Sequence, residues 1–500
     1  MAEIEKYDVV SEKISVEVRI SHEPGDYVKT YSVSTPRYPD GTRALLDALK
    51  EDIRAETAIR IGKLTTSDEI EKLKAKFSQR VADVIESESL PVGEKERAVV
   101  IGTILQEMLG LGPLEFLLND AHLEEIVVNG SSDPVWVYHR THGWLKTSIR
   151  IKREPEILNY ASIVARRVGR QINVLDPLLD AHLLTGERVN ATLFPVSSHG
   201  HTMTIRKSKK DPWTVVDLIA NNTVSSDVMA LVWMAMQYEL NIIISGGTAS
   251  GKTSFLNTLM PFIQPNHRVI SIEDTRELQL PEFMHWVPMV TREPNAEGKG
   301  GVQMLDLLVN SLRMRPDRVV VGEIRRQREA EVLFEAMHTG HSVYSTIHAD
   351  TAQQTIRRIT NAPISIPMNL LESVHLNIVM FRNRRTGYRR VLQLAEFVPS
   401  GEQGFESVAA NVLYRWKPGI DKVEFHSEGI RFFDDLALHT AFGKNEIKQD
   451  IETRKNILEW LVKNKTRDIL NVGKILAHYY LDKDSVIAAA EKNKKPESIL

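Results

Sequence analysis

The sequence contains no cysteine among its 500 residues. This absence excludes disulfides, thiol catalysis and every zinc site that uses cysteine, and it is consistent with a reducing compartment. Neither sign of charge dominates, since 63 Lys and Arg residues stand against 66 Asp and Glu residues. Broad binding to nucleic acid usually shows as a basic excess or a dense basic patch. We therefore expect no nucleic-acid partner.

The chain also lacks a long hydrophobic run. Its most apolar stretch, from Val228 to Met236, is too short to cross a bilayer, which takes about 20 residues. The charged N-terminus has no basic region followed by an apolar run, so it does not resemble a signal peptide. We expect a cytoplasmic protein with no transmembrane segment of its own.

A chain of this length predicts about two to four domains. Changes in composition and in hydrophobic periodicity divide it into a charged α-rich N-terminal region, a small α+β domain, a linker, an α/β domain and a mainly helical C-terminal extension. These segments cover residues 1–109, 110–207, 208–226, 227–400 and 401–500.

The fourth segment alternates short apolar runs with stretches of helical character. The expected strands are Asn241 to Ser245, Val269 to Glu273, Val319 to Val321 and Ser342 to Ser345. Nearly continuous apolar strands separated by helices are typical of a parallel sheet that helices cover on both faces. We therefore predict an α/β fold for this segment.

The first of these strands leads into GGTASGKT, Gly246 to Thr253, which matches the pattern G-x-x-x-x-G-K-[ST]. Glycines let backbone N–H groups converge on phosphates, the lysine reaches the β- and γ-phosphates, and the hydroxyl of Thr253 can ligate Mg²⁺. The following helix adds the positive end of its dipole. The pattern predicts that ATP and Mg²⁺ bind here, through Gly246, Gly247, Thr248, Ala249, Ser250, Gly251, Lys252, Thr253 and Ser254.

Hydrolysis also requires an acidic group that places the metal and the attacking water. Glu323 directly follows an apolar strand, with Gly322 where an aspartate often stands in P-loop enzymes. The segment ISIEDTREL supplies Glu273, Asp274 and Glu277 after another strand. We expect Glu323 and Asp274 to join Thr253 at the metal. Either Glu323 or Glu273 could be the base, and the sequence does not decide between them.

Histidines gather around the last expected strand, in His338-Thr-Gly-His341 and at His348. The strand separates His341 from His348 and no third ligand is near, so a zinc site is not expected. We interpret His341 and His348 as polar groups at the strand ends that sense the γ-phosphate.

These motifs, in this order, resemble those of the ATPases of type II and type IV secretion, type IV pili and the archaeal flagellum. The resemblance covers about residues 110–397 and rests on the phosphate loop, ISIEDTREL and four further segments. Those four are GLGPLEFLLNDAHLEEIVVNG (Gly110 to Gly130), GERVNAT (Gly186 to Thr192), RMRPDRVVVGEIR (Arg313 to Arg325) and TGHSVYSTIHA (Thr339 to Ala349). Bacterial type II members carry a tetracysteine zinc insertion, so a chain without cysteine is identified as an archaeal-type member.

The resemblance implies a RecA-like P-loop ATPase domain preceded by an α+β domain. It further implies a homo-hexamer with nucleotide in the cleft between the two domains, docked at the cytoplasmic face of a membrane on a polytopic platform protein. Arg188 and Arg206 are the candidates for arginines that approach the phosphates, with Arg140 weaker. Which machine is driven stays open. The alternatives are a RecA-like DNA translocase or helicase, and a nucleotide-gated scaffold that hydrolyses little ATP.

Overall fold

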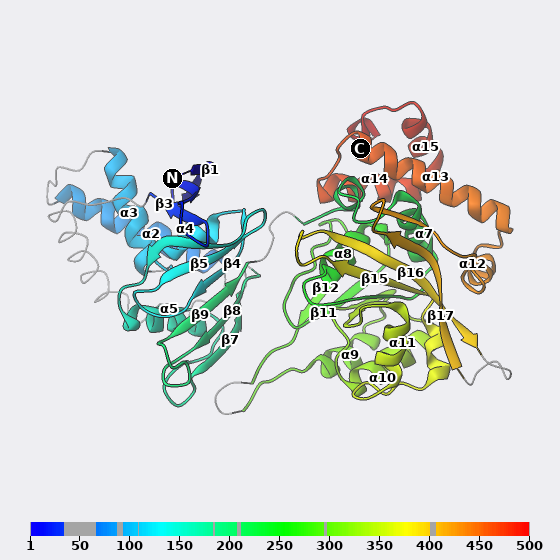
Figure 1. The fold of residues 1–500 in the computed structure, drawn as a ribbon, viewed down its shortest axis with the longest axis horizontal. Helices are drawn as coiled ribbons and strands as arrows, with labels where there is room; N and C mark the ends of the chain where they lie inside the picture. Colours follow the sequence, from blue (N-terminus) through cyan, green and yellow to red (C-terminus); the bar gives the residue numbers. More distant parts are fainter. Residues whose placement is uncertain are drawn as a thin grey trace. The chain divides into compact units, whose positions relative to one another are not determined.

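The structure is a computed structural model, and it describes residues 2–34, 67–87, 94–108, 110–183, 186–207, 212–294, 298–400 and 407–499. The chain divides into two compact units (Figure 1). The first contains residues 1–209 with residues 295–299, and the second contains residues 210–294 and 300–500. Residues 208–211 of the expected linker lie outside the described residues. Each unit is built around its own nine-stranded sheet.

The sheet of the first unit has the strand order β1-β2-β3-β6-β5-β4-β9-β8-β7. Neighbouring strands are antiparallel, except that β3 runs parallel to β6. The strands are β1 (Ala2–Ser11), β2 (Ile14–His22), β3 (Thr30–Val33), β4 (Leu123–Val128), β5 (Pro134–His139), β6 (Gly143–Arg150), β7 (Leu178–His182), β8 (Arg188–Thr192) and β9 (Thr202–Arg206).

Helices complete this unit: α2 (Ser67–Ser87), α3 (Glu94–Met108), α4 (Leu114–Asn119) and α5 (Glu154–Arg167). Ile157, Ala161 and Val164 of α5 are buried in the core of the sheet. Their spacing places them on one face of the helix. The unit is therefore an α+β domain.

The N-terminal region differs from the α-rich segment that we expected for residues 1–109. Its described helices begin only at Ser67, whereas residues 2–33 form β1, β2 and β3. The sequence ISVEVRI in β2 alternates apolar and polar residues, and Val16, Val18 and Ile20 are buried. A period of two is the pattern of a strand with one buried face. The charge content of this segment belongs to the exposed face of the sheet.

The sheet of the second unit has the order β12-β11-β13-β14-β10-β15-β16-β17-β18. It is parallel from β12 to β15 and antiparallel from β15 to β18. Its strands are β10 (Ile242–Gly246), β11 (Val269–Glu273), β12 (Trp286–Val290), β13 (Arg318–Val321), β14 (Ser342–Ile347), β15 (Leu376–Arg382), β16 (Arg389–Ser400), β17 (Ser407–Lys417) and β18 (Lys422–Phe425).

The α-helices of this unit are α6 (Val215–Ala220), α7 (Ser226–Gln237), α8 (Lys252–Leu259), α9 (Met304–Leu312), α10 (Gln327–His338), α11 (Ala352–Thr360), α12 (Phe432–Thr440), α13 (Lys444–Lys463), α14 (Ile469–Leu481) and α15 (Lys483–Glu491). Short 3₁₀ helices are η2 (Met260–Phe262), η3 (Met368–Ser373) and η4 (Pro496–Ile499). Thus α6 lies inside the expected linker. Likewise, residues 407–425 of the expected helical extension form β17 and β18.

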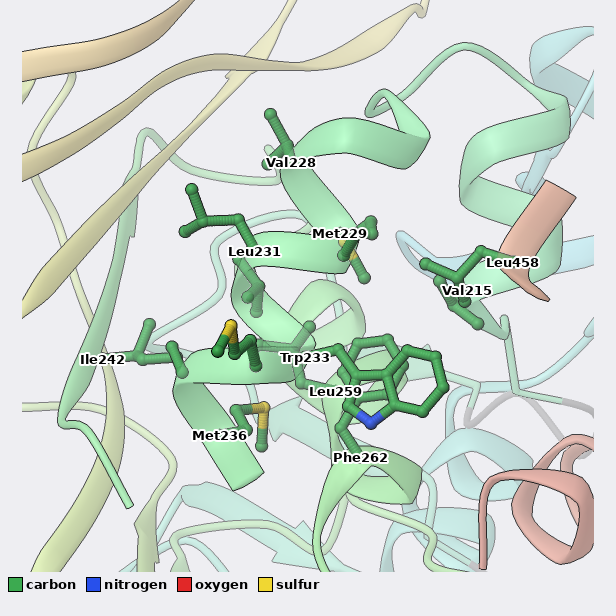
Figure 2. Close-up of a cluster of buried hydrophobic side chains, with 14 of the residues drawn as sticks. Val215, Val228, Met229, Leu231, Trp233, Met236, Ile242, Leu259, Phe262 and Leu458 are labelled. Carbon is green, nitrogen blue, oxygen red and sulfur yellow. The ribbon is translucent and has the colours of Figure 1, made fainter. Parts of the chain in front are cut away.

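Successive residues of the central strands point to opposite faces of this sheet. Ile242 and Ile244 of β10 pack in one core with α7, α8 and the C-terminal helices, whereas Ile243 packs in the other with α9 and α10. Figure 2 shows the first core, in which the ring of Trp233 stacks on Phe262 with centroids 5.5 Å apart, and α13 contributes Leu458. A largely parallel sheet with helices on both faces makes this unit an α/β domain of the RecA-like kind, as predicted.

Within the ranges that the structure describes, no helix combines the length and the apolar character that a membrane span requires.

Candidate active site

The site lies where the parallel strands of the second unit end. Because β10, β11, β13 and β14 are parallel, their carboxyl ends meet at one edge of the sheet, where open α/β sheets bind ligands. The phosphate loop leaves β10 at Gly246 and enters α8 at Lys252. Gly246 and Gly251 adopt positive φ angles of 152° and 94°, and a Cβ on Gly246 would lie 2.5 Å from the carbonyl oxygen of Met380. Glycine is therefore required at Gly246.

Lys252 is the first residue of α8, and its side chain folds back against the phosphate loop. Its Nζ donates hydrogen bonds to the carbonyl oxygens of Gly246 at 2.9 Å and Gly247 at 3.1 Å. Burial lowers the pKa of Lys252, and the charges of Glu323 and Asp350 oppose that shift. Among the described residues, Lys252 has two backbone carbonyls and an imidazole as hydrogen-bond partners, so neutral groups hold it. It can exchange them for phosphate oxygens, which bind an ammonium more strongly.

His348 connects this lysine to Glu323. Its Nδ1 lies 3.3 Å from Nζ of Lys252, and its Nε2 lies 2.9 Å from Oε1 of Glu323. Burial and the charge of Lys252 lower the pKa of His348, which favours the neutral ring. A neutral ring that accepts at Nδ1 and donates at Nε2 satisfies both partners, and this tautomer is assigned from them. His348 thus links the residue that binds phosphate to the principal acidic candidate.

Arg325 is a site residue that the sequence analysis did not select. Its Nη1 donates to Oδ2 of Asp274 at 2.6 Å, and its Nε donates to Oε2 of Glu323 at 2.8 Å. The two acidic residues come from different strand ends, and the arginine holds their carboxylates near each other. The available signal was its position two residues after Glu323 in RMRPDRVVVGEIR.

Glu273 is buried at the end of β11. Its Oε1 accepts hydrogen bonds from the backbone N–H groups of Glu277 at 2.9 Å and Leu278 at 3.1 Å. Its Oε2 has no hydrogen-bond partner among the described residues. Burial raises the pKa of Glu273 to about 7. Gly322 packs on it, because a Cβ there would lie 3.5 Å from Cγ of Glu273. The side chain of Glu277 is exposed, and its contact with Glu273 is made by its backbone N–H.

A cavity of about 450 Å³ opens beside the loop. Its walls come from the loop, the end of β14, α11 and the turn between β15 and β16, and four of its polar residues were not predicted from the sequence. The lining residues are Gly247, Thr248, His348, Ala349, Asp350, Gln354, Arg358 and Arg384. Asp350 directly follows TGHSVYSTIHA in the chain, which was the available signal for it. Arg358 lies nine residues beyond the end of this motif.

The structure does not bring His341 to this site, which corrects the interpretation of both histidines as γ-phosphate sensors. His341 precedes β14 and His348 follows it. A parallel strand rises about 3.3 Å per residue, so the seven residue steps from His341 to His348 place the two histidines roughly 23 Å apart along the sheet. The imidazole of His341 lies 3.4 Å from Oγ1 of Thr339, at the end of α10.

The two candidate arginines belong to the first unit, whereas the phosphate loop belongs to the second. Arg188 and Arg206 lie opposite each other on β8 and β9. Both are exposed, and Arg188 binds Asp180 through Nε at 3.1 Å and Nη2 at 2.6 Å. The weaker candidate, Arg140, lies 3.9 Å from a carboxylate oxygen of Glu124.

The donor groups of this edge fit a nucleotide with Mg²⁺. The loop has the backbone shape that converging N–H groups require, and Oγ of Ser250 is buried without a hydrogen-bond partner in the described part of the chain. Across those described ranges, no three His, Asp or Glu side chains form a metal site. Mg²⁺ in nucleotide sites is bound by one or two carboxylates together with phosphates and water. Glu323 and Asp274 would supply the carboxylates, and Thr253 would add a hydroxyl.

A phosphate loop at the end of β10, with acidic residues at the ends of β11 and β13, defines a P-loop nucleotide-binding protein with a RecA-like domain. The family model described as "Type II/IV secretion system protein" matches residues 107–468. The chain belongs to this family of secretion ATPases, so the resemblance seen in its motifs is confirmed.

The chain is also similar to individual proteins. An uncharacterized protein of the archaeon Methanocaldococcus jannaschii is 33% identical over 412 residues, which cover 81% of this chain and 73% of that protein. The type IV secretion system protein PtlH of Bordetella pertussis is 30% identical over 312 residues, covering 55% of this chain and 91% of PtlH. The crystal structure of the Legionella pneumophila ATPase DotB aligns with a TM-score of 0.40 at 20% identity, covering 75% of this chain and 93% of DotB.

Proposed function

We propose that this chain hydrolyses ATP to ADP and phosphate with Mg²⁺, as one subunit of a homo-hexameric motor. The observation that carries the proposal is the chain of contacts from Lys252 through His348 to Glu323. It joins a group suited to the terminal phosphates with a carboxylate suited to water, and membership of the secretion ATPase family supports it.

The proposed roles follow from where the side chains lie. Lys252 and the loop amides bind the phosphates, and His348 senses the terminal one through its contact with Lys252. Glu323 orients the attacking water, because it is the acidic side chain that His348 ties to the phosphate loop. Glu273 is the alternative base, although one of its oxygens is occupied by two backbone N–H groups.

Bound Mg²⁺ would neutralise charge that develops on the phosphates during transfer. Thr253 offers it a hydroxyl, and Glu323 and Asp274 offer carboxylates. Arg325 holds these two carboxylates at 2.6 to 2.8 Å from its own nitrogens.

We further propose that the motor works at the cytoplasmic face of a membrane, on a polytopic platform protein of a secretion or pilus machine. Arg188 and Arg206 would then approach the phosphates from the N-terminal domain of the same or a neighbouring subunit. Stabilisation of charge on the transferring phosphoryl group is the physical reason for such arginines.

Two variants test the hydrolytic proposal. We expect Lys252→Ala to lose ATP binding, measured by titration calorimetry. We expect Glu323→Gln to keep that binding and to release phosphate roughly 100-fold more slowly, since the carboxylate that orients water is lost.

Glu335→Gln is the matched control, because Glu335 is exposed on α10 and carries the same chemical change. Unchanged phosphate release in Glu323→Gln would favour a nucleotide-gated scaffold. Stimulation of the wild type by single-stranded DNA, without stimulation by a membrane partner, would favour a DNA translocase.

A further inference from the structure

The turn between β15 and β16 is rich in arginine and lies beside the phosphate loop. β15 pairs with β10 in parallel, and Gly246 lies opposite Met380. The two strands of the hairpin close at Arg382 and Arg389, which face each other in register. The turn is fixed by hydrogen bonds from the N–H of Asn383 to the carbonyl of Tyr388 at 2.8 Å, and from Gly387 back to Asn383 at 2.9 Å.

Arg389 contacts the phosphate loop from this hairpin. Its Nε donates a hydrogen bond to the carbonyl oxygen of Ala249 at 3.2 Å. Its aliphatic stem covers Gly251, where a Cβ would lie 3.3 Å from Cδ of the arginine. Ala249 has a φ of 59°, a left-handed conformation that costs energy for a residue with a side chain. A charged donor on its carbonyl stabilises that conformation.

The next residue anchors the hairpin. Arg390 is buried and makes a two-pronged ion pair with Asp421, at 2.7 Å from Nε and 2.7 Å from Nη2. The indole N–H of Trp416 donates to the same carboxylate at 3.0 Å. The hydrogen bond from Arg390 lowers the pKa of Asp421 to about 2, so this ion pair is intact at neutral pH. The turn between β17 and β18 therefore holds the backbone at Arg389.

Lys252 and Arg389 hold the loop in different ways. Lys252 occupies the carbonyls of Gly246 and Gly247, and it has to release them when it binds phosphate. Arg389 holds the carbonyl of Ala249 from a separate hairpin, and nothing in phosphate binding requires it to let go. It can keep the amide N–H groups convergent while the lysine changes partners.

We propose that Arg389, anchored through the Arg390–Asp421 ion pair, is a positioning residue that keeps the phosphate loop in its binding shape. The inference rests on the proposed nucleotide function and goes beyond it, because it gives the β15–β16 and β17–β18 hairpins a task at the site. It predicts a loss of nucleotide affinity, and not of chemistry, when Arg389 is removed.

The test compares Arg389→Gln with the wild type in the full chain. We expect the KM for ATP and the Kd for ADP, by calorimetry, to rise about tenfold, the size of one charge-assisted hydrogen bond. We expect kcat to stay within about twofold, since the loop holds substrate and transition state alike. Arg389→Lys, which keeps the charge and a donor, should recover part of the affinity.

Arg385→Gln is the control, since Arg385 is exposed on the same turn and its side chain makes no hydrogen bond among the described residues. Equal affinities in the Arg389→Gln and Arg385→Gln proteins would overturn the proposal. So would a fall in kcat at unchanged KM, which would make Arg389 a catalytic residue.

Asp421→Asn removes the anchor without touching the loop, and it serves where Arg389→Gln fails to fold. We expect Asp421→Asn to raise the KM for ATP less than Arg389→Gln does. In the protein that carries both substitutions, KM should equal that of Arg389→Gln, because both changes act through one contact. Additive effects would contradict the anchoring. A wild-type protein that binds neither ATP nor ADP would overturn the proposed function itself. If the wild type binds nucleotide and the Arg389→Gln protein binds it with the same affinity, only this inference is overturned.

Discussion

At the scale of single residues, the site depends on side chains that touch two partners. His348 touches Lys252 and Glu323, and Arg325 touches Glu323 and Asp274. Each is bonded on both sides, so its orientation is fixed before a substrate arrives. Fixed dipoles and charges cost no reorganisation at the moment of reaction. The arrangement explains why a histidine serves next to the lysine, since a neutral ring can accept from one partner and donate to the other.

Histidines at the two ends of β14 give a matched pair of variants. We expect His348→Ala to lower kcat roughly 100-fold, because Glu323 loses the donor on Oε1 and Lys252 loses a partner. We expect His341→Ala to stay within about twofold of the wild type, since a strand length separates it from the phosphate loop. Steady-state phosphate release at saturating ATP measures both. Similar losses in both variants would show that His341 acts at the site, contrary to its position here.

The sequence allowed us to predict site residues that belong to one continuous motif, but it gave no signal for candidates that depend on spatial neighbours. The spacing of Gly246, Gly251 and Lys252 in a single loop carries its own chemistry. Arg325 and Arg389 gain their roles only when separate strands become adjacent in the sheet, and arginines in isolation are usually solvated. We assigned His341 and His348 to one site because the same motif contains both. The strand between them places them at opposite edges of the sheet.

At the scale of elements, the C-terminal helices belong to the core of the ATPase domain. Trp233 of α7 is fully buried, and its Nε1 donates to the hydroxyl of Tyr480 in α14 at 2.7 Å. The guanidinium of Arg454 in α13 lies 4.9 Å from the centre of the same indole. Arg454 is also buried and pairs with Asp450 at 2.7 Å. These helices pack against α7, so they stabilise the domain that contains the phosphate loop.

A substitution in α13 tests whether these helices are integral to the domain. Leu458 is fully buried in the core shown in Figure 2. We expect Leu458→Ala to lower the free energy of unfolding by about 2–5 kcal/mol, through lost burial and the cavity left behind. Urea unfolding followed by tryptophan fluorescence measures it.

Lys448→Ala, at an exposed position of the same helix, should stay within about 0.5 kcal/mol of the wild type. A Leu458→Ala protein as stable as this control would show that α13 is a detachable extension.

Periodicity explains which elements the sequence could predict. The apolar runs of β10, β11, β13 and β14 are flanked by helical patterns and were found within a residue or two of their bounds. The strands β1 to β3 were hidden by their charge, because only every second residue is buried. The strand that joins β3 to the rest of the sheet, β6, lies more than a hundred residues further along the chain, and pairing over such a distance leaves no local signal.

At the scale of the whole molecule, the proposed function draws on residues of both units. The phosphate loop, Glu323 and His348 all lie in the second unit, and Arg188 and Arg206 lie in the first. Arg188 is already bound to Asp180 in this structure, whereas Arg206 is exposed on the neighbouring strand. In the proposed ring, a nucleotide could draw either arginine towards its phosphates, and that movement would be the motor's stroke.

Arg206 allows a direct test of which subunit completes a site. We expect Arg206→Gln alone to lower kcat at least 100-fold, as the loss of a phosphoryl-stabilising arginine does in other P-loop enzymes. Lys252→Ala alone should also be inactive. If Arg206 serves the neighbouring subunit, an equal mixture of the two inactive proteins regains activity. A working site then combines the intact Lys252 of an Arg206→Gln subunit with the intact Arg206 of a neighbouring Lys252→Ala subunit. Random mixing gives this pairing at about a quarter of the sites in a closed ring.

The test requires rings that contain both variants. The two proteins are therefore combined at low concentration, where subunits exchange, before ATP is added. Ring formation is followed by mass in solution. A mixture of Lys252→Ala with Glu323→Gln is the control, because both changes lie in the second unit and neither supplies what the other lacks. Recovery in the Arg206 mixture alone places the arginine in the neighbour's site. No recovery, with rings of mixed composition present, places it within its own subunit. Full activity of Arg206→Gln by itself would remove this arginine from the mechanism and leave Arg188 as the candidate.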